Sequence, residues 1–229
     1  MSGLQRLSGN QLKIIAAICM TADHIGLMLF PQCLLLRIIG RVAMPLFAYM
    51  IAEGCRYTKN RTRYLLGIVT LAAVVQLLYY FALNSIYQCI LVTFALSIGL
   101  IYMADYAIKK RSAFSWLPFA FLLAATAFLT MVLPRLLSGT DFAIDYGFWG
   151  VLLPVGVYLG KTKKQQLALC GVGLALLTVT YGTIQAFSFL ALPLLMLYSG
   201  ARGRLKMNYF FYIYFPVHLV ALWLLGFWI

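Results

Sequence analysis

Charged side chains are scarce in this sequence of 229 residues: Asp, Glu, Lys and Arg make up 10%, whereas hydrophobic residues make up 64%. An ordinary soluble domain has about 25% charged and about 45–50% apolar residues. The chain therefore has too few polar side chains to cover a water-soluble globule of its size, which excludes soluble globular folds, disordered chains and coiled coils. The class that remains is an integral membrane protein built from helix-length apolar runs.

Several chemical signatures are also missing. The five cysteines show no CxxC spacing and lie mostly in apolar surroundings, so neither a zinc site nor a disulfide framework is expected. Neither HExxH nor GxSxG occurs, and Gly160-Lys161-Thr162 lacks the earlier glycine that a phosphate-binding loop needs. No metal cofactor is therefore expected. The first apolar run is long enough to stay in the bilayer, so no cleavable signal peptide is expected either.

What the sequence does contain is a series of nine apolar runs, each a candidate transmembrane helix. The seventh and eighth are short and share the turn-like segment 181–183, so they form either two spans or one re-entrant pair. The predicted fold is an all-α, polytopic membrane helix bundle that forms a single domain over residues 1–229. The predicted spans are 12–30, 33–53, 64–83, 86–106, 113–134, 143–160, 165–181, 184–199 and 207–228.

Of the eighteen Lys and Arg residues, fifteen lie at the start of the first span or in every second connection between these spans. Arg37 and Arg41 lie inside the second span, and only Arg135 departs from the alternation of the connections. Basic connections mark the cytoplasmic side of a membrane protein, so nine spans predict a cytoplasmic N-terminus and an external C-terminus. We interpret the net charge of +13 as a topology signal and expect no nucleic-acid partner. The predicted location is the inner (cytoplasmic) membrane, with lipids as partners. The basic clusters are Arg6 and Lys13, Arg56 to Arg63, Lys109 to Arg111, Lys161 to Lys164, and Arg202 to Lys206.

Few ionisable groups fall deep inside the predicted spans: Asp23 and His24 in the first, Arg37 and Arg41 in the second, and His218 in the ninth. A charge at mid-bilayer costs about 2.5–3.5 kcal/mol on insertion scales, so such groups persist only when they are paired or line a wet cavity. Helix rise puts Asp23, His24 and Arg41 roughly 9–12 Å below the external boundary, and His218 roughly 15 Å below it. We therefore predict an Asp23–Arg41 ion pair, and a cavity that the two histidines and the arginines share.

The second span also repeats notable residues every four positions, which favours one shared face of a helix. Pro45 frees a backbone carbonyl and permits a kink beside the buried charge. The series is Arg37, Arg41, Pro45, Tyr49 and Glu53. Tyr214 and His218 stand one turn apart in the ninth span, and Asp145 begins the sixth span on its external side.

Each of these groups has a structural alternative. Asp23 and Arg41 form a plausible assembly ion pair without chemistry, and the alternative for His218 is a hydrogen-bonded helix contact. Glu53 is explained as a partner of the Arg56 cluster. Asp145 is explained as a helix start near the external surface.

Several motifs resemble those of the TraX family of conjugation-associated membrane proteins. The resemblance runs nearly from end to end, and it is weakest over residues 112–140, which match only in being hydrophobic. The motifs that carry it are Leu12–Ala17, Asp23–Gly26, Leu36–Tyr49, Ala52–Gly54, Asp145–Gly147 with Gly150–Leu153, Tyr209–Tyr212 and Phe215–Leu219.

This resemblance implies a function. The family is associated with N-terminal acetylation of pilin and is similar to a wider superfamily of transmembrane acyltransferases with an intramembrane histidine and nearby arginines. By that resemblance, cytosolic acetyl-CoA supplies the acyl group, and an amine or hydroxyl acceptor is modified at the external side. The expected catalytic residues are His24 as general base, Asp23 and His218. The expected binding residues for acyl-CoA or acceptor are Arg37, Arg41, Tyr49, Glu53, Asp145 and Tyr214.

Imidazole suits the role of base because its ordinary pKa is near neutrality. Two other functions remain open from the sequence. Intramembrane Asp, His and Arg also build proton-coupled transporters, although no internal repeat is detectable here. A non-catalytic assembly factor for a pilus or secretion system is the third candidate.

Overall fold

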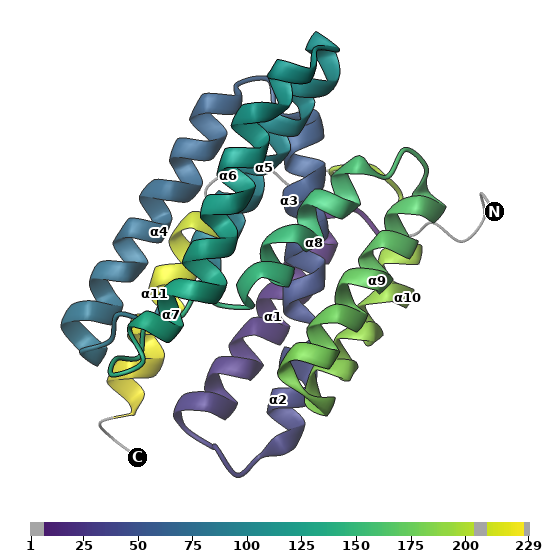
Figure 1. Ribbon diagram of the computed structural model, residues 1–229. Helices are drawn as coiled ribbons and strands as arrows, with labels where there is room; N and C mark the ends of the chain where they lie inside the picture. The colour runs from purple at the N-terminus through teal and green to yellow at the C-terminus, as the bar shows by residue number, and fades with distance from the viewer. Residues whose placement is uncertain (1–6, 204–209, 227–229) are drawn as a thin grey trace. The chain divides into compact units, whose positions relative to one another are not determined.

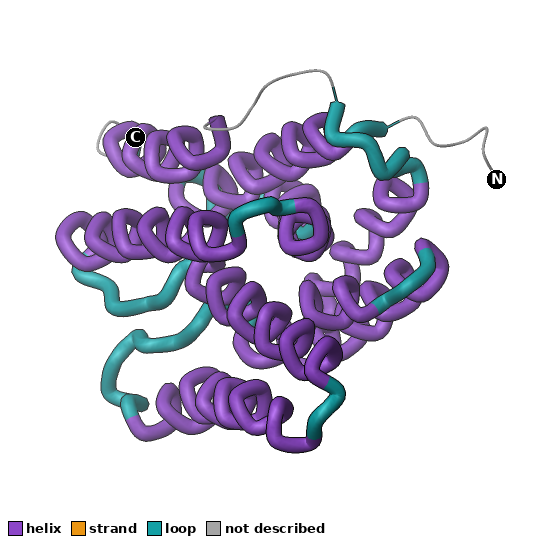
Figure 2. The backbone as a smooth tube through the Cα atoms, turned by 90° about the horizontal axis from the view of Figure 1, so that it is seen from above, coloured by secondary structure: helices purple, strands orange, loops and turns teal. Residues whose placement is uncertain are grey.

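The computed structural model describes residues 7–203 and 210–226, and every regular element in these two ranges is helical (Figures 1 and 2). Five helical stretches are long and apolar enough to cross a membrane: Gly9–Met28, Leu34–Tyr57, Arg61–Leu83, Ile90–Lys110 and Ala113–Leu136. The expectation of an all-helical, multi-pass membrane protein is therefore confirmed. Arg6, Arg204, Lys206, Tyr209 and the two ends of the ninth predicted span lie outside the described residues.

The remaining predicted spans also fall on helical segments, but these are shorter or more polar. The apolar stretches Gly147–Leu159, Thr183–Met196 and Phe210–Leu225 have fewer than eighteen residues each. The helix α9 (Lys163–Tyr181) is longer but begins with two lysines and two glutamines. The total of nine spans and the side of the membrane on which each terminus lies stay predictions.

The chain forms two compact units. The first unit comprises Met1–Met50 and Leu167–Ile229, and the second comprises Ile51–Gln166. In the first unit, α1 (Gly9–Met28) packs against α2 (Leu34–Gly40) and α11 (Phe210–Leu225). The 3-10 helix η3 (Thr183–Leu190) packs against α2 and leads into α10 (Ala191–Met196). The two histidines of the protein thus lie on the adjacent helices α1 and α11.

Local sequence explains how α1 begins. Ser8 and Gln11 form a capping box, in which each side chain bonds to the backbone N–H of the other residue. The N–H of Gly9 donates to the carbonyl of Ala201 over 2.8 Å, and that of Asn10 donates to Arg202 over 3.0 Å. The start of α1 is therefore tied to the connection that follows α10.

A close approach and a break together shape the α1–α2 hairpin, whose short turn is visible in Figure 1. A Cβ atom at Gly40 would overlap the carboxyl group of Asp23, so only glycine allows this side chain to lie against α2. The helix then breaks at Arg41 and Val42 before α3 (Ala43–Tyr57) begins. Pro45 has no N–H to donate to the carbonyl of Arg41. The helix is thus interrupted beside the buried charge, at the place where the sequence indicated that Pro45 permits a kink.

The second unit is built around α5 (Ile90–Lys110), which packs against α4 (Arg61–Leu83), α6 (Leu117–Ala127) and α8 (Gly147–Leu159). Buried hydroxyls join α5 to α8: Ser97 donates to the carbonyl of Val151, and Thr93 donates to that of Asp145. The short η1 (Ala113–Trp116) precedes α6, and η2 (Phe128–Val132), a π-helical turn, leads into α7 (Leu133–Leu136). Phe81, Phe114 and Phe121 are each more than three-quarters exposed, a surface suited to lipid chains.

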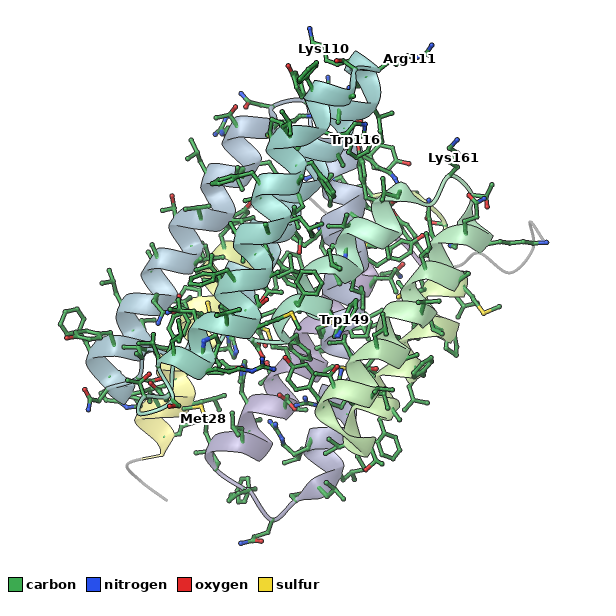
Figure 3. All side chains as sticks on the ribbon, viewed as in Figure 1. Met28, Lys110, Arg111, Trp116, Trp149 and Lys161 are labelled. Carbon is green, nitrogen blue, oxygen red and sulfur yellow. The ribbon has the colours of Figure 1, made fainter. Side chains whose placement is uncertain are left out.

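The basic connections of the second unit gather at one end. Arg56 donates to the carbonyls of Val157, Tyr158 and Gly160 over 2.6–3.0 Å, which ties the end of α3 to the end of α8. The labelled side chains Lys110, Arg111 and Lys161 all extend from the end of this unit drawn uppermost in Figure 3.

The connections without Lys or Arg meet at the other end of the second unit. The N–H of Gln88 donates to the carbonyl of Ala143, and the N–H of Asp145 donates to the carbonyl of Gln88. The hydroxyl of Ser85 and the N–H of Ile86 both donate to the carboxylate of Asp141. These bonds lower the pKa of Asp141, since they stabilise its charged form. Within this unit, the alternation of basic and non-basic connections along the sequence corresponds to two opposite ends.

Candidate functional site

One carboxylate and two guanidinium groups form an ionic cluster in the first unit. Oδ1 of Asp23 lies 2.7 Å from Nη2 of Arg41, and Oδ2 lies 3.0 Å from Nη1 of Arg37. The Asp23 side chain is 17% exposed, Arg41 12% and Arg37 25%. The predicted Asp23–Arg41 ion pair is present, and Arg37 makes it a three-residue cluster.

Backbone carbonyls hold the two arginines further. Arg37 donates to the carbonyl of Asp23 over 3.2 Å, and Nε of Arg41 donates to the carbonyl of Arg37 over 3.3 Å. The carbonyl of Arg37 also accepts the backbone N–H of Arg41 over 3.2 Å. The backbone and the side chain of Arg41 are thus both bonded to α2, which holds the guanidinium beside the cluster.

The cluster carries more positive than negative charge. Asp23 is the sole Asp or Glu in residues 1–50 and 167–229, so no second acidic side chain in this unit is available to balance the second guanidinium. Cationic donors that outnumber their carboxylate partners can stabilise negative charge that develops on a reacting oxygen.

His24 and His218 meet beside this cluster, with Nδ1 of His24 lying 2.9 Å from Nε2 of His218. Nδ1 of His218 lies 3.0 Å from the carbonyl oxygen of Tyr214. A carbonyl can only accept, so in neutral His218 the proton is on Nδ1 and Nε2 is an acceptor. Nδ1 of His24 must then carry a proton and donate it to His218. The basic ring nitrogen of the pair is therefore Nε2 of His24.

Aromatic contacts fix the plane of the second imidazole. The ring of Tyr214 stacks on His218 with centroids 5.2 Å apart, and Phe215 packs edge-on at 5.5 Å. The hydroxyl of Tyr214 in turn makes a short hydrogen bond with Thr21 of α1. Since both ring nitrogens of His218 are already bonded, this residue is suited to orient His24.

Two uncharged residues near the cluster escaped the sequence analysis. Gln185 on η3 is 1% exposed, and its Oε1 accepts from Nη1 of Arg41 over 3.4 Å. Ser188 lies one 3-10 turn later and is fully buried. The amide Nε2 of Gln185 and the hydroxyl of Ser188 have no hydrogen-bond partner among the described residues. The signal that could have revealed them is their spacing, because Gln185 and Ser188 are two polar residues three positions apart in an apolar run.

Three of the predicted binding residues have other neighbours. Tyr49 is buried, with its ring edge-on to Tyr198 at 5.9 Å. Glu53 pairs with Arg56 at 2.7 Å, and Asp145 accepts from the hydroxyl of Tyr87 over 2.8 Å. Glu53 and Asp145 belong to the second unit. The structure thus gathers Asp23, His24, Arg37, Arg41, Tyr214 and His218 in the first unit.

The four-residue series of the second predicted span is accordingly divided. The helix break at Arg41 separates Arg37 on α2 from Tyr49 and Glu53 on α3, so the series does not follow one straight helix. The described residues contain no group of three or more His, Cys, Asp or Glu side chains that could hold a metal ion. The chemistry that this site offers is that of an imidazole base beside cationic and amide donors.

Comparison with known proteins points to one family. The family model described as "TraX protein" matches residues 8–226. The chain is 25% identical over 241 aligned residues to "Probable fimbrial assembly protein FimC, serogroup H1" of Dichelobacter nodosus, with 94% of each chain covered. It is 46% identical over 59 residues to "Uncharacterized protein RP591" of Rickettsia prowazekii (strain Madrid E), which covers 25% of this chain and 23% of that protein. No solved structure matches it significantly.

Proposed function

Because the chain belongs to the TraX family, we propose that it is a membrane-embedded acyltransferase. It moves an acetyl group from cytosolic acetyl-CoA to an amine or hydroxyl acceptor at the external side of the inner membrane. The observation that carries the proposal is the hydrogen bond between His24 and His218, whose tautomers leave Nε2 of His24 as the base. His24 directly follows Asp23 of the ionic cluster on α1.

The proposed reaction is one acyl transfer. Nε2 of His24 takes the proton from the acceptor N–H or O–H, and the acceptor atom attacks the thioester carbonyl carbon. The C–S bond then breaks, and the sulfur of coenzyme A leaves with the proton returned by His24. The products are the acetylated acceptor and the free thiol, so no oxidant or metal enters the balance.

His218 and Tyr214 act as positioning residues in this mechanism. His218 accepts from Nδ1 of His24 and so stabilises the imidazolium that forms when Nε2 gains a proton, as the orienting member of a catalytic triad does. The expected catalytic role of His218 thus becomes a positioning role in this proposal, because neither of its ring nitrogens is open to a substrate. Asp23 serves the two arginines instead of the imidazole.

Arg37 and Arg41 supply the positive charge that the transition state requires. The carbonyl oxygen of the thioester becomes negative during attack, and preorganised cationic donors in a site of low dielectric stabilise such an oxyanion. Their excess over carboxylate in the first unit suits this role.

The acceptor is proposed to be an exported protein of a pilus or a similar surface structure. The resemblance to the family implies N-terminal acetylation of pilin, and the name of the relative from Dichelobacter nodosus concerns fimbrial assembly. That name also supports a second candidate function, an assembly role without catalysis. The two differ in whether His24 is needed.

The test is acetyl transfer by the purified protein in lipid nanodiscs, with labelled acetyl-CoA and a co-purified pilin-type acceptor. His24→Gln keeps a polar side chain without the basic nitrogen, and the expected rate falls at least about 100-fold, the usual contribution of a general base. His218→Asn is expected to reduce the rate less, since the base itself remains. Thr180→Val is the matched control, because its hydroxyl bonds only within α9 and is exposed.

Full transfer by His24→Gln would reject His24 as the base. Absence of transfer by the wild-type protein, together with surface assembly that His24→Gln restores in cells lacking the gene, would support the assembly role instead.

A further inference from the structure

We infer that Gln185 and Ser188 form the subsite that binds the carbonyl oxygen of the acyl group. The inference rests on the proposed function and adds substrate-binding residues to it. It starts from two buried polar groups without hydrogen-bond partners on one face of a helix that contacts α2.

The geometry of η3 puts these two groups together. A 3-10 helix has three residues per turn, so the side chains of residues i and i+3 lie above one another. Gln185, Ser188 and Ala191 are all buried, whereas Ala186, Phe187 and Leu190 between them are exposed. The buried face of η3 therefore presents the Gln185 amide and the Ser188 hydroxyl as neighbours.

Arg41 fixes which way the Gln185 amide points. A guanidinium can only donate, so the atom that faces Nη1 of Arg41 at 3.4 Å is the amide oxygen. The amide NH2 group must then point elsewhere, and its nitrogen is buried without an acceptor. A donor in this state is costly, and a native protein retains it where a ligand or water satisfies it.

The chemistry of the two groups indicates a carbonyl oxygen as the occupant. An amide N–H and a hydroxyl are neutral donors, whereas phosphate groups are held mainly by cationic ones. Arg41 polarises the amide through its oxygen, which strengthens the N–H as a donor. A thioester oxygen bound here would be held more tightly as it becomes negative, because the Arg41 guanidinium lies next to the Gln185 amide.

If a thioester carbonyl occupies this subsite, the protein should bind acetyl-CoA more tightly than free coenzyme A. Binding measurements can test this preference without catalysis. Acetyl-CoA has the thioester carbonyl, and free coenzyme A lacks it. The dissociation constants of both are measured by microscale thermophoresis on the full-length protein in nanodiscs. Gln185→Leu is expected to weaken acetyl-CoA binding about tenfold, the usual effect of one lost hydrogen bond, and to leave the affinity for coenzyme A unchanged. Ser188→Ala is expected to act in the same direction.

Two control variants remove polar groups outside the subsite. Gln76→Leu removes a part-buried glutamine of the second unit, whose amide donates to the carbonyl of Tyr87. Thr178→Val removes a hydroxyl of α9 that bonds only to the carbonyl of Leu174. Both are expected to keep the wild-type ratio of the two dissociation constants. Ser188→Ala removes a single oxygen atom, so it remains testable if Gln185→Leu does not fold.

The outcomes separate the two proposals. If the wild-type protein transfers acetyl groups but Gln185→Leu and Ser188→Ala keep its preference for acetyl-CoA over coenzyme A, the subsite is wrong and the acyltransferase stands. Equal affinities of the wild-type protein for the two molecules would also overturn the subsite. If the wild-type protein neither binds nor uses acetyl-CoA, the proposed function fails and the subsite fails with it.

Discussion

Replacing Asp23 with Asn tests whether the ionic cluster behaves as a buried, charge-rich site or as an ordinary surface ion pair. The substitution keeps the shape of the side chain, so the close packing against Gly40 is preserved while the negative charge is removed. Both arginines then face an uncharged amide in a low-dielectric setting. Arg41 is the more affected of the two, since its side chain is 12% exposed and that of Arg37 is 25% exposed.

The expected loss of stability follows from leaving a buried guanidinium without its carboxylate partner. Removing one partner of a buried ion pair costs about 3–5 kcal/mol, mainly because the other charge is left uncompensated. Arg37 retains access to solvent or lipid headgroups, so the lower end of this range applies, about 3 kcal/mol. In the double variant with Arg41→Gln, the loss should be smaller than the sum of the single losses by about 1.5–3 kcal/mol, the value of a hydrogen bond to a charged group.

The measurement is reversible unfolding in mixed detergent micelles, followed by circular dichroism, for the wild-type protein, both single variants and the double variant. Asp141→Asn removes an exposed carboxylate of the second unit and serves as the control, with a smaller expected change. A loss below about 1 kcal/mol for Asp23→Asn, which is typical of a surface pair, would refute the reasoning. So would strict additivity with Arg41→Gln.

Three further predictions concern packing, capping and pH. Gly40→Ala is expected to destabilise by about 1–3 kcal/mol, the range for overpacking, whereas Gly171→Ala, whose Cβ has 3.9 Å of room in a helix, should stabilise by about 0.5–1 kcal/mol in the same unfolding assay. Arg56→Gln should cost about 2 kcal/mol, because the carbonyls at the end of α8 lose their charged donor; unchanged thermal unfolding would contradict this. The pKa of Asp141 is lowered by the Ser85 hydroxyl first and by a backbone N–H second. The stability that these hydrogen bonds contribute is therefore present above the ordinary pKa of 3.8 and is lost as the pH falls through the lowered pKa. Ser85→Ala should move that pKa upward in a carbon-13 NMR titration, and an unmoved titration would exclude the hydroxyl as the cause.

The charged part of the site was predictable from the sequence because charge in a membrane is expensive. Asp23, Arg37 and Arg41 had to be paired, and the two-residue connection between their spans made α1 and α2 neighbours. Depth alone predicted a cavity shared by His24 and His218, although 193 residues separate them in the sequence, and the structure adds the direct hydrogen bond between them.

Depth and periodicity did not predict the uncharged part of the site. Gln185 and Ser188 carry no charge, so they did not stand out among the ionisable groups, and the spacing of three that unites them belongs to a 3-10 helix instead of an α-helix. Tyr49 and Glu53 were grouped with the arginines because a repeat of four assumes one straight helix. The break that Pro45 causes ends that repeat at Arg41.

The hydrogen bonds of the histidine pair also bear on the transport alternative. A proton relay needs groups that can each accept a proton on one side and release one on the other. The path from His24 leads through His218 to the backbone carbonyl of Tyr214, which accepts a hydrogen bond but has no proton to pass on. A proton that reaches His24 must therefore leave by the nitrogen at which it arrived. This return suits a base that takes a proton from an acceptor and gives it to a leaving thiolate, and the histidine pair offers no through-going relay of protons.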